Sequence, residues 1–153
     1  KLIDNIKKRI PDCAISMDMI SGFCSESEND HQQTLSLMDY VKYDFGYMFK
    51  YSERPNTSAA RMEDDVSDTT KQRRLSEIIA KQQSHSFSHM NDKIGQTLEV
   101  LIEGVSKKSN QHFFGRTTYN STVVFEKKDK KIGDYVMVKI ENCTSATLQG
   151  KII

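Results

Sequence analysis

The sequence has no tryptophan, only two prolines and three cysteines, and no strong excess of either charge. With 22 basic and 21 acidic residues, the chain as a whole has no strong attraction to nucleic acid or to an anionic membrane, so RNA binding would need a local patch. No apolar run approaches the length that spans a bilayer, and the first residues form a basic amphipathic stretch rather than a signal peptide. We therefore expect a cytoplasmic protein with no membrane partner.

The cysteines are Cys13, Cys24 and Cys143. An odd number argues against a disulfide framework, and their spacing suits neither zinc nor an iron–sulfur cluster. His85 and His89 share a helix face at i, i+4 but have no third ligand nearby in the sequence. P-loop, dinucleotide and nucleophile-elbow motifs are also absent. The sequence therefore predicts no metal site and no catalytic residue of these kinds.

Helical and strand patterns alternate in the first 92 residues. Apolar positions at helical spacing predict a helix that ends near Pro11. Residues 13–23 are mostly apolar and predict a strand buried on both faces, and residues 45–51 predict a second strand. Ser25 or Ser27 can cap the helix between them. This order is typical of α/β folds, in which the loop after a strand, here residues 52–60, carries binding groups.

A long helix follows, with Arg73 and Arg74 expected on or beside its polar side. It is expected to link two domains, residues 1–92 and 93–153. From Gly95 the apolar period changes to two, and five short β-type runs are separated by Gly, Asn, Asp and Lys turns. This pattern predicts a small five-stranded antiparallel barrel of the oligonucleotide-binding type.

Lysines and aromatic rings gather in the turns and strand ends of the predicted barrel. Cations neutralise phosphates and rings stack on unpaired bases, which is what single-stranded or loop RNA requires. Alternatively, the lysines only solvate a surface and the rings fill the core, and composition alone favours this interpretation. The residues concerned include Lys107, Lys108, Phe113, Phe114, Arg116, Tyr119 and Lys151.

Two further features lie at predicted strand ends. Arg54 can clamp a carboxylate or phosphate in bidentate fashion, with hydroxyls nearby on Tyr51, Ser52 and Thr57. The alternative is a turn whose arginine makes a surface ion pair. Gly22 can let a ligand approach the backbone, with Ile20 as an apolar wall for a flat ring. A simple turn is the competing interpretation.

Several blocks of the sequence together resemble the radical-SAM tRNA methylthiotransferase family, of the MiaB type, which converts isopentenyladenosine beside the anticodon into its 2-methylthio derivative. The resemblance covers essentially the whole chain. Its departures are Cys24 and Ser25, where a Pro-Gly pair is common, and Asn56, where glycine is usual. The blocks are Asp18–Phe23 with Glu26 and Asp30, Gly46–Ala60, Asp65 and Val66, Arg73–Leu75, Glu103, Gly104, Ser106–Lys108, Gly115–Thr117, Asn120, Gly133, Asp134, Val136 and Val138.

The resemblance implies a C-terminal fragment, consistent with a chain that begins at Lys1 inside a helical pattern. It would comprise the second half of a radical-SAM barrel, a partial TIM-type barrel, and a TRAM domain. The full enzyme would use S-adenosyl-L-methionine and two 4Fe-4S clusters. Their cysteine ligands are absent from this sequence, so the fragment is expected to be inactive alone. Expected partners are the tRNA anticodon stem-loop, the missing N-terminal half and a sulfur donor system.

The resemblance also implies roles for individual residues. Ile20, Gly22 and Phe23 would line the adenosyl part of the cofactor, while Tyr51, Ser52, Arg54 and Thr57 would face cofactor or target nucleotide. Lys107, Lys108, Phe114, Arg116 and Lys151 would contact RNA. The sequence Arg54-Pro55 favours a tRNA substrate over a ribosomal protein. The alternatives left open are a methylthiotransferase for threonylcarbamoyl-adenosine and a non-enzymatic RNA-binding protein.

Overall fold

The computed structural model describes all residues, 1–153, and the chain divides into two compact units. The first comprises residues 1–5 and 15–85, and the second residues 6–14 and 86–153. None of the helices combines the length and the apolar character needed to cross a membrane.

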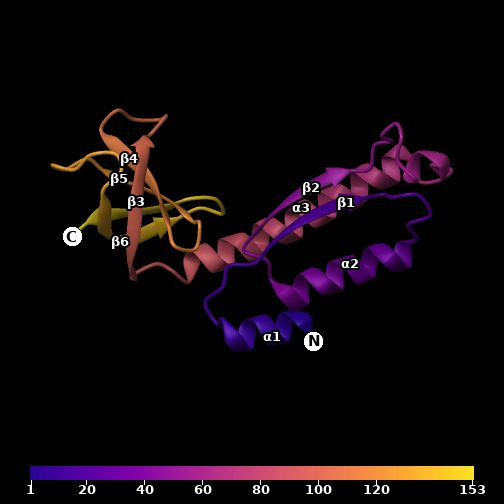
Figure 1. Ribbon diagram of the computed structural model, residues 1–153, viewed down its shortest axis with the longest axis horizontal. Coiled ribbons are helices and arrows are strands. Elements are labelled where there is room, and N and C mark those ends of the chain that lie inside the picture. Colours follow the sequence, from indigo (N-terminus) through magenta and orange to yellow (C-terminus); the bar gives the residue numbers. More distant parts are fainter. The chain divides into compact units, whose positions relative to one another are not determined.

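The first unit is an α/β arrangement around a two-stranded parallel sheet. Strands β1 (Ser16–Ser21) and β2 (Phe45–Lys50) pair in register from Ser16 opposite Phe45 to Ser21 opposite Lys50. Helix α2 (Glu28–Val41) connects them, as the sequence predicts (Figure 1). The other elements are α1 (Leu2–Arg9), the short 3₁₀ helix η1 (Ala59–Arg61) and α3 (Asp68–Asn91). Helices α1 and α3 each contribute residues to both units.

Helix α2 begins at Ser27, so Ser27 rather than Ser25 is the cap. The Asp30 backbone N–H donates to the Ser27 side chain at 3.2 Å, and the Ser27 backbone N–H donates to the Asp30 carboxylate at 2.9 Å. This reciprocal pair satisfies two N–H groups that the helix leaves without partners. The helix ends at Lys42, which adopts a left-handed φ of 54°.

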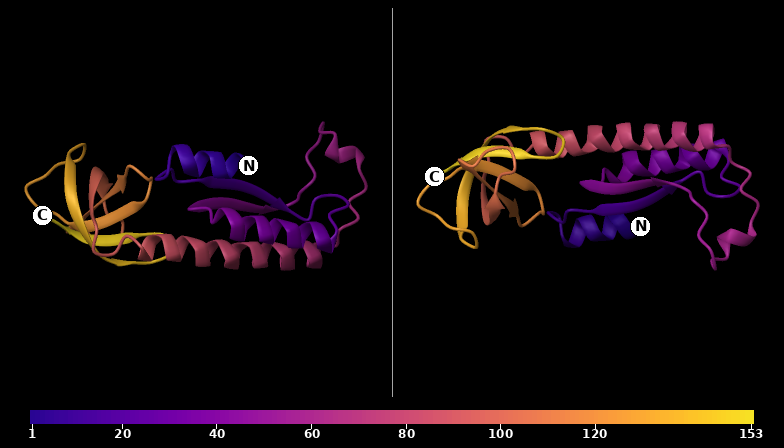
Figure 2. Two further views of the ribbon diagram at one scale, coloured as in Figure 1. Left: turned by 90° about the horizontal axis from the view of Figure 1, so that it is seen from below. Right: turned by 90° about the horizontal axis from the view of Figure 1, so that it is seen from above.

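Burial on both faces of β1 was a wrong prediction. Met17 and Ser21 are buried, whereas Ile20 is 57% exposed. Helices cover only one face of the sheet, where Met17 packs with Met38 of α2 and Ile78 of α3. The helices run alongside the strands in the further views (Figure 2). The opposite face is open and carries the exposed residues Asp18, Ile20, Tyr47 and Phe49.

The buried stripe of α3 is mostly polar, which also differs from the prediction. Arg73 is exposed as expected, but Arg74 is only 4% exposed. The stripe follows helical spacing and consists of Lys71, Arg74, Ile78, Gln82 and Ser86. Apolar periodicity could not identify it, because polar side chains break the pattern, and the backbone carbonyls that accept from Arg74 and Gln82 belong to the distant residues Glu26 and Tyr43.

The second unit contains a closed five-stranded barrel, in the order β3-β4-β5-β7-β6. The strands are β3 (Thr97–Val105), β4 (His112–Thr117), β5 (Thr122–Glu126), β6 (Tyr135–Cys143) and β7 (Leu148–Ile152). The predicted barrel is confirmed, but β5 and β7 pair in parallel. Directions that alternate around a ring of five strands cannot close, so a purely antiparallel barrel was impossible.

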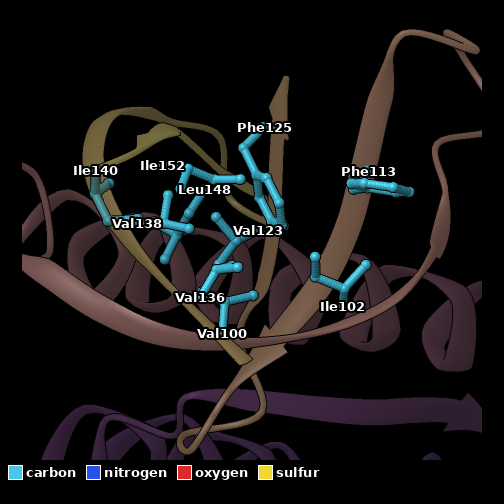
Figure 3. Packing of buried hydrophobic residues seen from close by; sticks show 10 residues of the cluster. All are labelled: Val100, Ile102, Phe113, Val123, Phe125, Val136, Val138, Ile140, Leu148 and Ile152. Carbon is cyan, nitrogen blue, oxygen red and sulfur yellow. The ribbon is translucent and has the colours of Figure 1, made fainter. Parts of the chain in front are cut away.

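Side chains that alternate along the strands fill the barrel. Ten buried hydrophobic residues form one cluster (Figure 3). The Phe113 and Phe125 rings pack at a centroid distance of 6.4 Å, so both rings belong to the core. Gly115 allows β4 to approach β3, since a Cβ there would lie 2.1 Å from the Leu101 carbonyl oxygen.

Candidate functional site

Six residues predicted from the sequence meet at the carboxyl ends of β1 and β2. They line a hollow of about 470 Å³, which we call the strand-end hollow. Its walls combine apolar and aromatic side chains with hydroxyl groups and cations, a combination suited to a small ligand with a flat ring and a charged end. The lining residues are Ile20, Phe23, Phe49, Lys50, Tyr51, Ser52, Arg54, Thr57 and Ala59.

Gly22, the remaining predicted residue of this group, packs against the protein itself. It has a φ of +75°, and a Cβ at this position would lie 2.3 Å from Cγ of Lys71. The N–H of Gly22 donates to the Glu26 carboxylate, and the N–H of Phe23 donates to the same oxygen at 3.1 Å. Glycine is therefore required here to let the Lys71 side chain pass beneath the turn.

Tyr51 forms the floor of the strand-end hollow and is 7% exposed. Its ring meets the Phe23 ring edge-on at 5.0 Å, and the Nζ of Lys71 lies 5.1 Å from its centroid. A hydrogen bond with the Cys24 side chain, together with burial, raises the pKa of the Tyr51 hydroxyl to about 12. Tyr51 is thus a neutral aromatic side chain at physiological pH.

The loop after β2 presents a free cation. The Thr57 hydroxyl donates to the Arg54 carbonyl at 2.8 Å and accepts from the Ala60 N–H at 3.2 Å, which shapes the loop. Asn56 adopts a left-handed φ of 65°, as expected where glycine is usual. The Arg54 side chain makes no ion pair, contrary to the alternative interpretation of this loop. Its guanidinium is available to a carboxylate or phosphate.

Sequence reasoning missed the buried charges that support this hollow. Lys71 is 3% exposed, and its Nζ lies 2.5 and 2.6 Å from the two Asp64 carboxylate oxygens. Asp65 accepts from the Ser25 N–H at 2.7 Å. The acidic segment before α3 is thereby tied to the turn after β1. The helical spacing of Lys71 and Arg74 was the available signal.

A second cavity, of about 540 Å³, lies on the outer face of the barrel, and we call it the barrel-face cavity. Phe114, Val124 and Gln149 form a row in register across β4, β5 and β7. Lys107 and Lys108 reach the cavity from the loop after β3. Ser106, Ser109, His112, Thr122, Thr144 and Thr147 complete its lining.

The other two predicted RNA-binding residues flank this cavity. Arg116 pairs with Thr122 in the strand register, so its side chain points to the same outer face. Lys151 lines a neighbouring hollow of about 270 Å³ that shares His112 with the barrel-face cavity. Its Nζ lies 3.0 Å from the Glu141 carboxylate, which raises the Lys151 pKa. One face of the barrel therefore gathers all five predicted residues, together with His112, which was not predicted.

Neither unit provides an obvious metal site. No three His, Cys, Asp or Glu side chains group in a way that could hold a metal ion. Cys13 is exposed, Cys24 is buried and Cys143 is partly buried, and all three are free.

Residues 92–153 match the TRAM domain model. Curated relatives named tRNA-2-methylthio-N(6)-dimethylallyladenosine synthase match 99% of this chain, with 61% identity in Christiangramia forsetii and 58% in Flavobacterium psychrophilum. A relative of the same name from Bacteroides fragilis is 51% identical over 95% of this chain.

Each match covers 32% of the relative, so the chain spans about a third of the length of these proteins. Among solved structures, the apo form of Mycoplasma genitalium RNase R has a TM-score of 0.33 and 15% identity, covering 56% of this chain and 17% of that chain, a likeness too weak for any argument. Over almost its whole length the chain is therefore similar to about a third of these tRNA-2-methylthio-N(6)-dimethylallyladenosine synthases, and its residues 92–153 match the TRAM domain model.

Proposed function

We propose that this chain contributes a ligand hollow and an RNA-binding barrel to a tRNA methylthiotransferase, which adds a methylthio group to C2 of isopentenyladenosine next to the anticodon. The observation that carries the proposal is the convergence of the implied residues. Six line the strand-end hollow, and five lie on one face of the barrel. Such an enzyme needs both a cofactor site and a surface for its RNA substrate.

The α/β unit would form part of a larger radical-SAM barrel. A two-stranded parallel sheet is small, and its open face exposes Ile20, Tyr47 and Phe49. Parallel sheets are normally covered on both faces. Helices on one face and an open apolar face on the other suit the wall of a barrel, whose interior would lie on the open side.

The strand-end hollow fits S-adenosyl-L-methionine in its residue chemistry. Ile20 and Phe23 offer apolar walls for the adenine ring, and the unpaired Arg54 guanidinium suits the carboxylate of the methionine part. When bound, the cofactor and its iron–sulfur cluster supply the radical that activates the target carbon. The chain brings no three suitable ligands together. In this proposal, the cluster ligands come from other parts of the enzyme.

The barrel face would hold single-stranded or loop RNA. Phe114 provides a stacking platform, and Lys107 and Lys108 stand beside it to neutralise phosphates. Arg116 extends the positive charge along β4. Binding should weaken as salt rises, because each phosphate contact releases counterions. Arg116→Ala should weaken binding of an anticodon stem-loop, and unchanged affinity would remove Arg116 from the RNA face.

The proposal is tested by mass spectrometry of tRNA from cells that lack the methylthiotransferase and carry the full-length gene containing this segment. We expect 2-methylthio-isopentenyladenosine to appear, and Arg54→Ala to reduce it strongly. Arg61→Ala, an exposed arginine in η1, is the matched control and should leave it unchanged. Accumulation of unmodified isopentenyladenosine would favour the threonylcarbamoyl-adenosine substrate or an RNA-binding role without catalysis.

A further inference from the structure

The hairpin between β4 and β5 carries a cluster of cationic, aromatic and amide side chains outside the barrel-face cavity. The Nζ of Lys93 lies 5.0 Å from the centroid of the Tyr119 ring. Lys93 has no carboxylate partner, and both side chains are partly exposed. We call this group the hairpin cluster. It consists of Lys93, from the segment between α3 and β3, and of Arg116, Tyr119 and Asn120 of the hairpin.

The hairpin has a fixed shape. Thr117 is buried, and its hydroxyl oxygen accepts from the N–H groups of Tyr119 at 3.3 Å and Ser121 at 3.2 Å. Asn120 adopts a left-handed φ of 61°, and its N–H donates to the Thr117 carbonyl at 2.9 Å. The backbone that carries Tyr119 is therefore held in place without a ligand, which lowers the entropy lost when the hairpin binds one.

Arg116 joins this hairpin to the barrel-face cavity. Its Nη1 donates to the Asn120 side-chain oxygen at 2.8 Å, and its Nε donates to Glu103 at 3.2 Å. These bonds leave Nη2 free and orient the guanidinium. Along β4, His112, Phe114 and Arg116 point to the same outer face, and this row spans about 13 Å. The row connects the cavity with the hairpin without interruption.

We propose that the hairpin cluster is a second RNA contact, so that one strand runs from the barrel-face cavity over Arg116 to the hairpin. Lys93 and Arg116 neutralise phosphates of this strand, and Tyr119 stacks on a base next to them. This inference rests on the proposed RNA-binding function and extends it, because it predicts a site for several nucleotides rather than one. Lys93, a cation without an acidic partner, lies beside an aromatic ring on a preformed hairpin, and this combination suits a nucleic acid strand.

The test measures binding of the full chain to two unstructured RNA oligonucleotides, one of about four and one of about eight nucleotides, by fluorescence anisotropy. Lys93→Gln should weaken binding of the longer RNA about tenfold and leave the shorter RNA unaffected. It should also reduce the slope of log affinity against log salt by about 0.7, the value for one phosphate contact of a single strand. Tyr119→Leu should weaken binding of the longer RNA without changing that slope.

Lys139→Gln is the matched control, since Lys139 is an exposed lysine on β6 and its loss changes the net charge by the same amount. Equal affinity of Lys93→Gln and Lys139→Gln for the longer RNA would overturn the inference. If substitution of Phe114 still weakened binding in that case, the proposed function would stand. If neither RNA binds the unmodified chain, the proposed function fails first, and the inference fails with it. Lys93 is outside the barrel core, so its variant does not depend on refolding of the core.

Discussion

The barrel encloses ten buried hydrophobic residues in one closed sheet, whereas the α/β unit buries a cluster of three and places charged side chains along the inner stripe of α3. Lys71 bonds Asp64, Arg74 bonds the Glu26 backbone carbonyl at 2.8 Å, and His31 lies 2.6 Å from Glu77. The two regions are thus stabilised by different interactions. The barrel should respond mainly to changes of volume, and the α/β unit to changes of charge.

This difference matches the proposed roles. A closed barrel has no free strand edges and provides a rigid surface for RNA. The α/β unit has an open sheet face and a hollow whose turns are held by charged side chains, such as the Glu26 carboxylate, which accepts from the N–H groups of Gly22 and Phe23. Buried ion pairs add little net stability but fix one arrangement when all partners are present. That arrangement is what a ligand site requires.

The largest expected effect is in the barrel core. Phe125 is fully buried and central to the cluster. Phe125→Ala should lower the free energy of unfolding of the barrel by about 3–5 kcal/mol, because it removes apolar contacts and leaves a cavity. Denaturant unfolding followed by NMR signals of each unit would measure this. If signals of the α/β unit reported an equal loss of unfolding free energy, the two regions would not be stabilised separately, and this account would be contradicted.

A slightly smaller effect is expected from the buried charge of α3. Arg74→Ala should destabilise the α/β unit by about 3 kcal/mol, because it leaves Glu26 without its cation in a largely buried site. The neighbouring Arg73→Ala is the matched control, since Arg73 is exposed and its ion pairs are screened. Chemical denaturation of both variants gives the comparison. A larger loss for Arg73 than for Arg74 would refute the importance of burial.

Acid should also destabilise the two regions to different extents, with a smaller effect than either of these substitutions. Hydrogen bonds from Arg73 lower the Glu28 pKa from 4.5 to about 2, and the hydrogen bond with His31 lowers the Glu77 pKa. A carboxyl pKa that folding lowers adds stability above its unfolded value, which is lost as pH falls through the folded pKa. The α/β unit should therefore weaken between pH 4.5 and about 2.

The core of the barrel consists of ten buried hydrophobic residues, which do not titrate, and on its surface the Glu141 carboxylate raises the pKa of Lys151. The stability that a raised lysine pKa adds is lost as pH rises through the folded value, which lies far above the acid range. Amide signals of the barrel should thus persist in acid after those of α2 and α3 broaden. The reverse order of loss would contradict the charge-based account of the α/β unit.

The smallest expected effect is in the loop beside the strand-end hollow. Asn56→Ala should cost about 1–2 kcal/mol, because alanine tolerates the left-handed φ of 65° poorly. Asn56→Gly should be close to neutral. Thermal unfolding would compare them, and equal stability of the two variants would show that this backbone geometry is not retained in solution.

The sequence predicted best where the periodicity of a single segment decides the structure. Alternation in residues 97–152 indicated the five strands, and the two candidate caps, Ser25 and Ser27, indicated the start of α2, of which Ser27 is the cap. The parallel pairing of β5 with β7 could not be read from alternation, because strand direction follows from closure of the whole barrel. Burial of β1 was also wrong, since it depends on which elements cover each face.

The candidate sites, too, were predicted best where neighbouring residues of one segment form them. Ile20, Phe23 and the loop residues 51–57 could be predicted because they lie next to one another at strand ends. Lys71 and His112 were not predicted, because their places beside the two hollows follow from neighbours that only folding brings to them. Lys71 reaches beneath the turn at Gly22, and His112 lines both neighbouring hollows. Polar residues on an expected core face are the signal to examine in related sequences.

The most direct test of the central claim is an NMR titration of the isotope-labelled chain with an unstructured RNA. We predict saturable, salt-sensitive shifts at residues 107–108, 112–116, 122–124 and 149–151, the outer face of β4, β5 and β7. Shifts confined to the outer side of β3 and β6, around Leu101, Tyr135 and Met137, would contradict the assignment of the RNA face. The absence of saturable shifts would contradict RNA binding by this barrel.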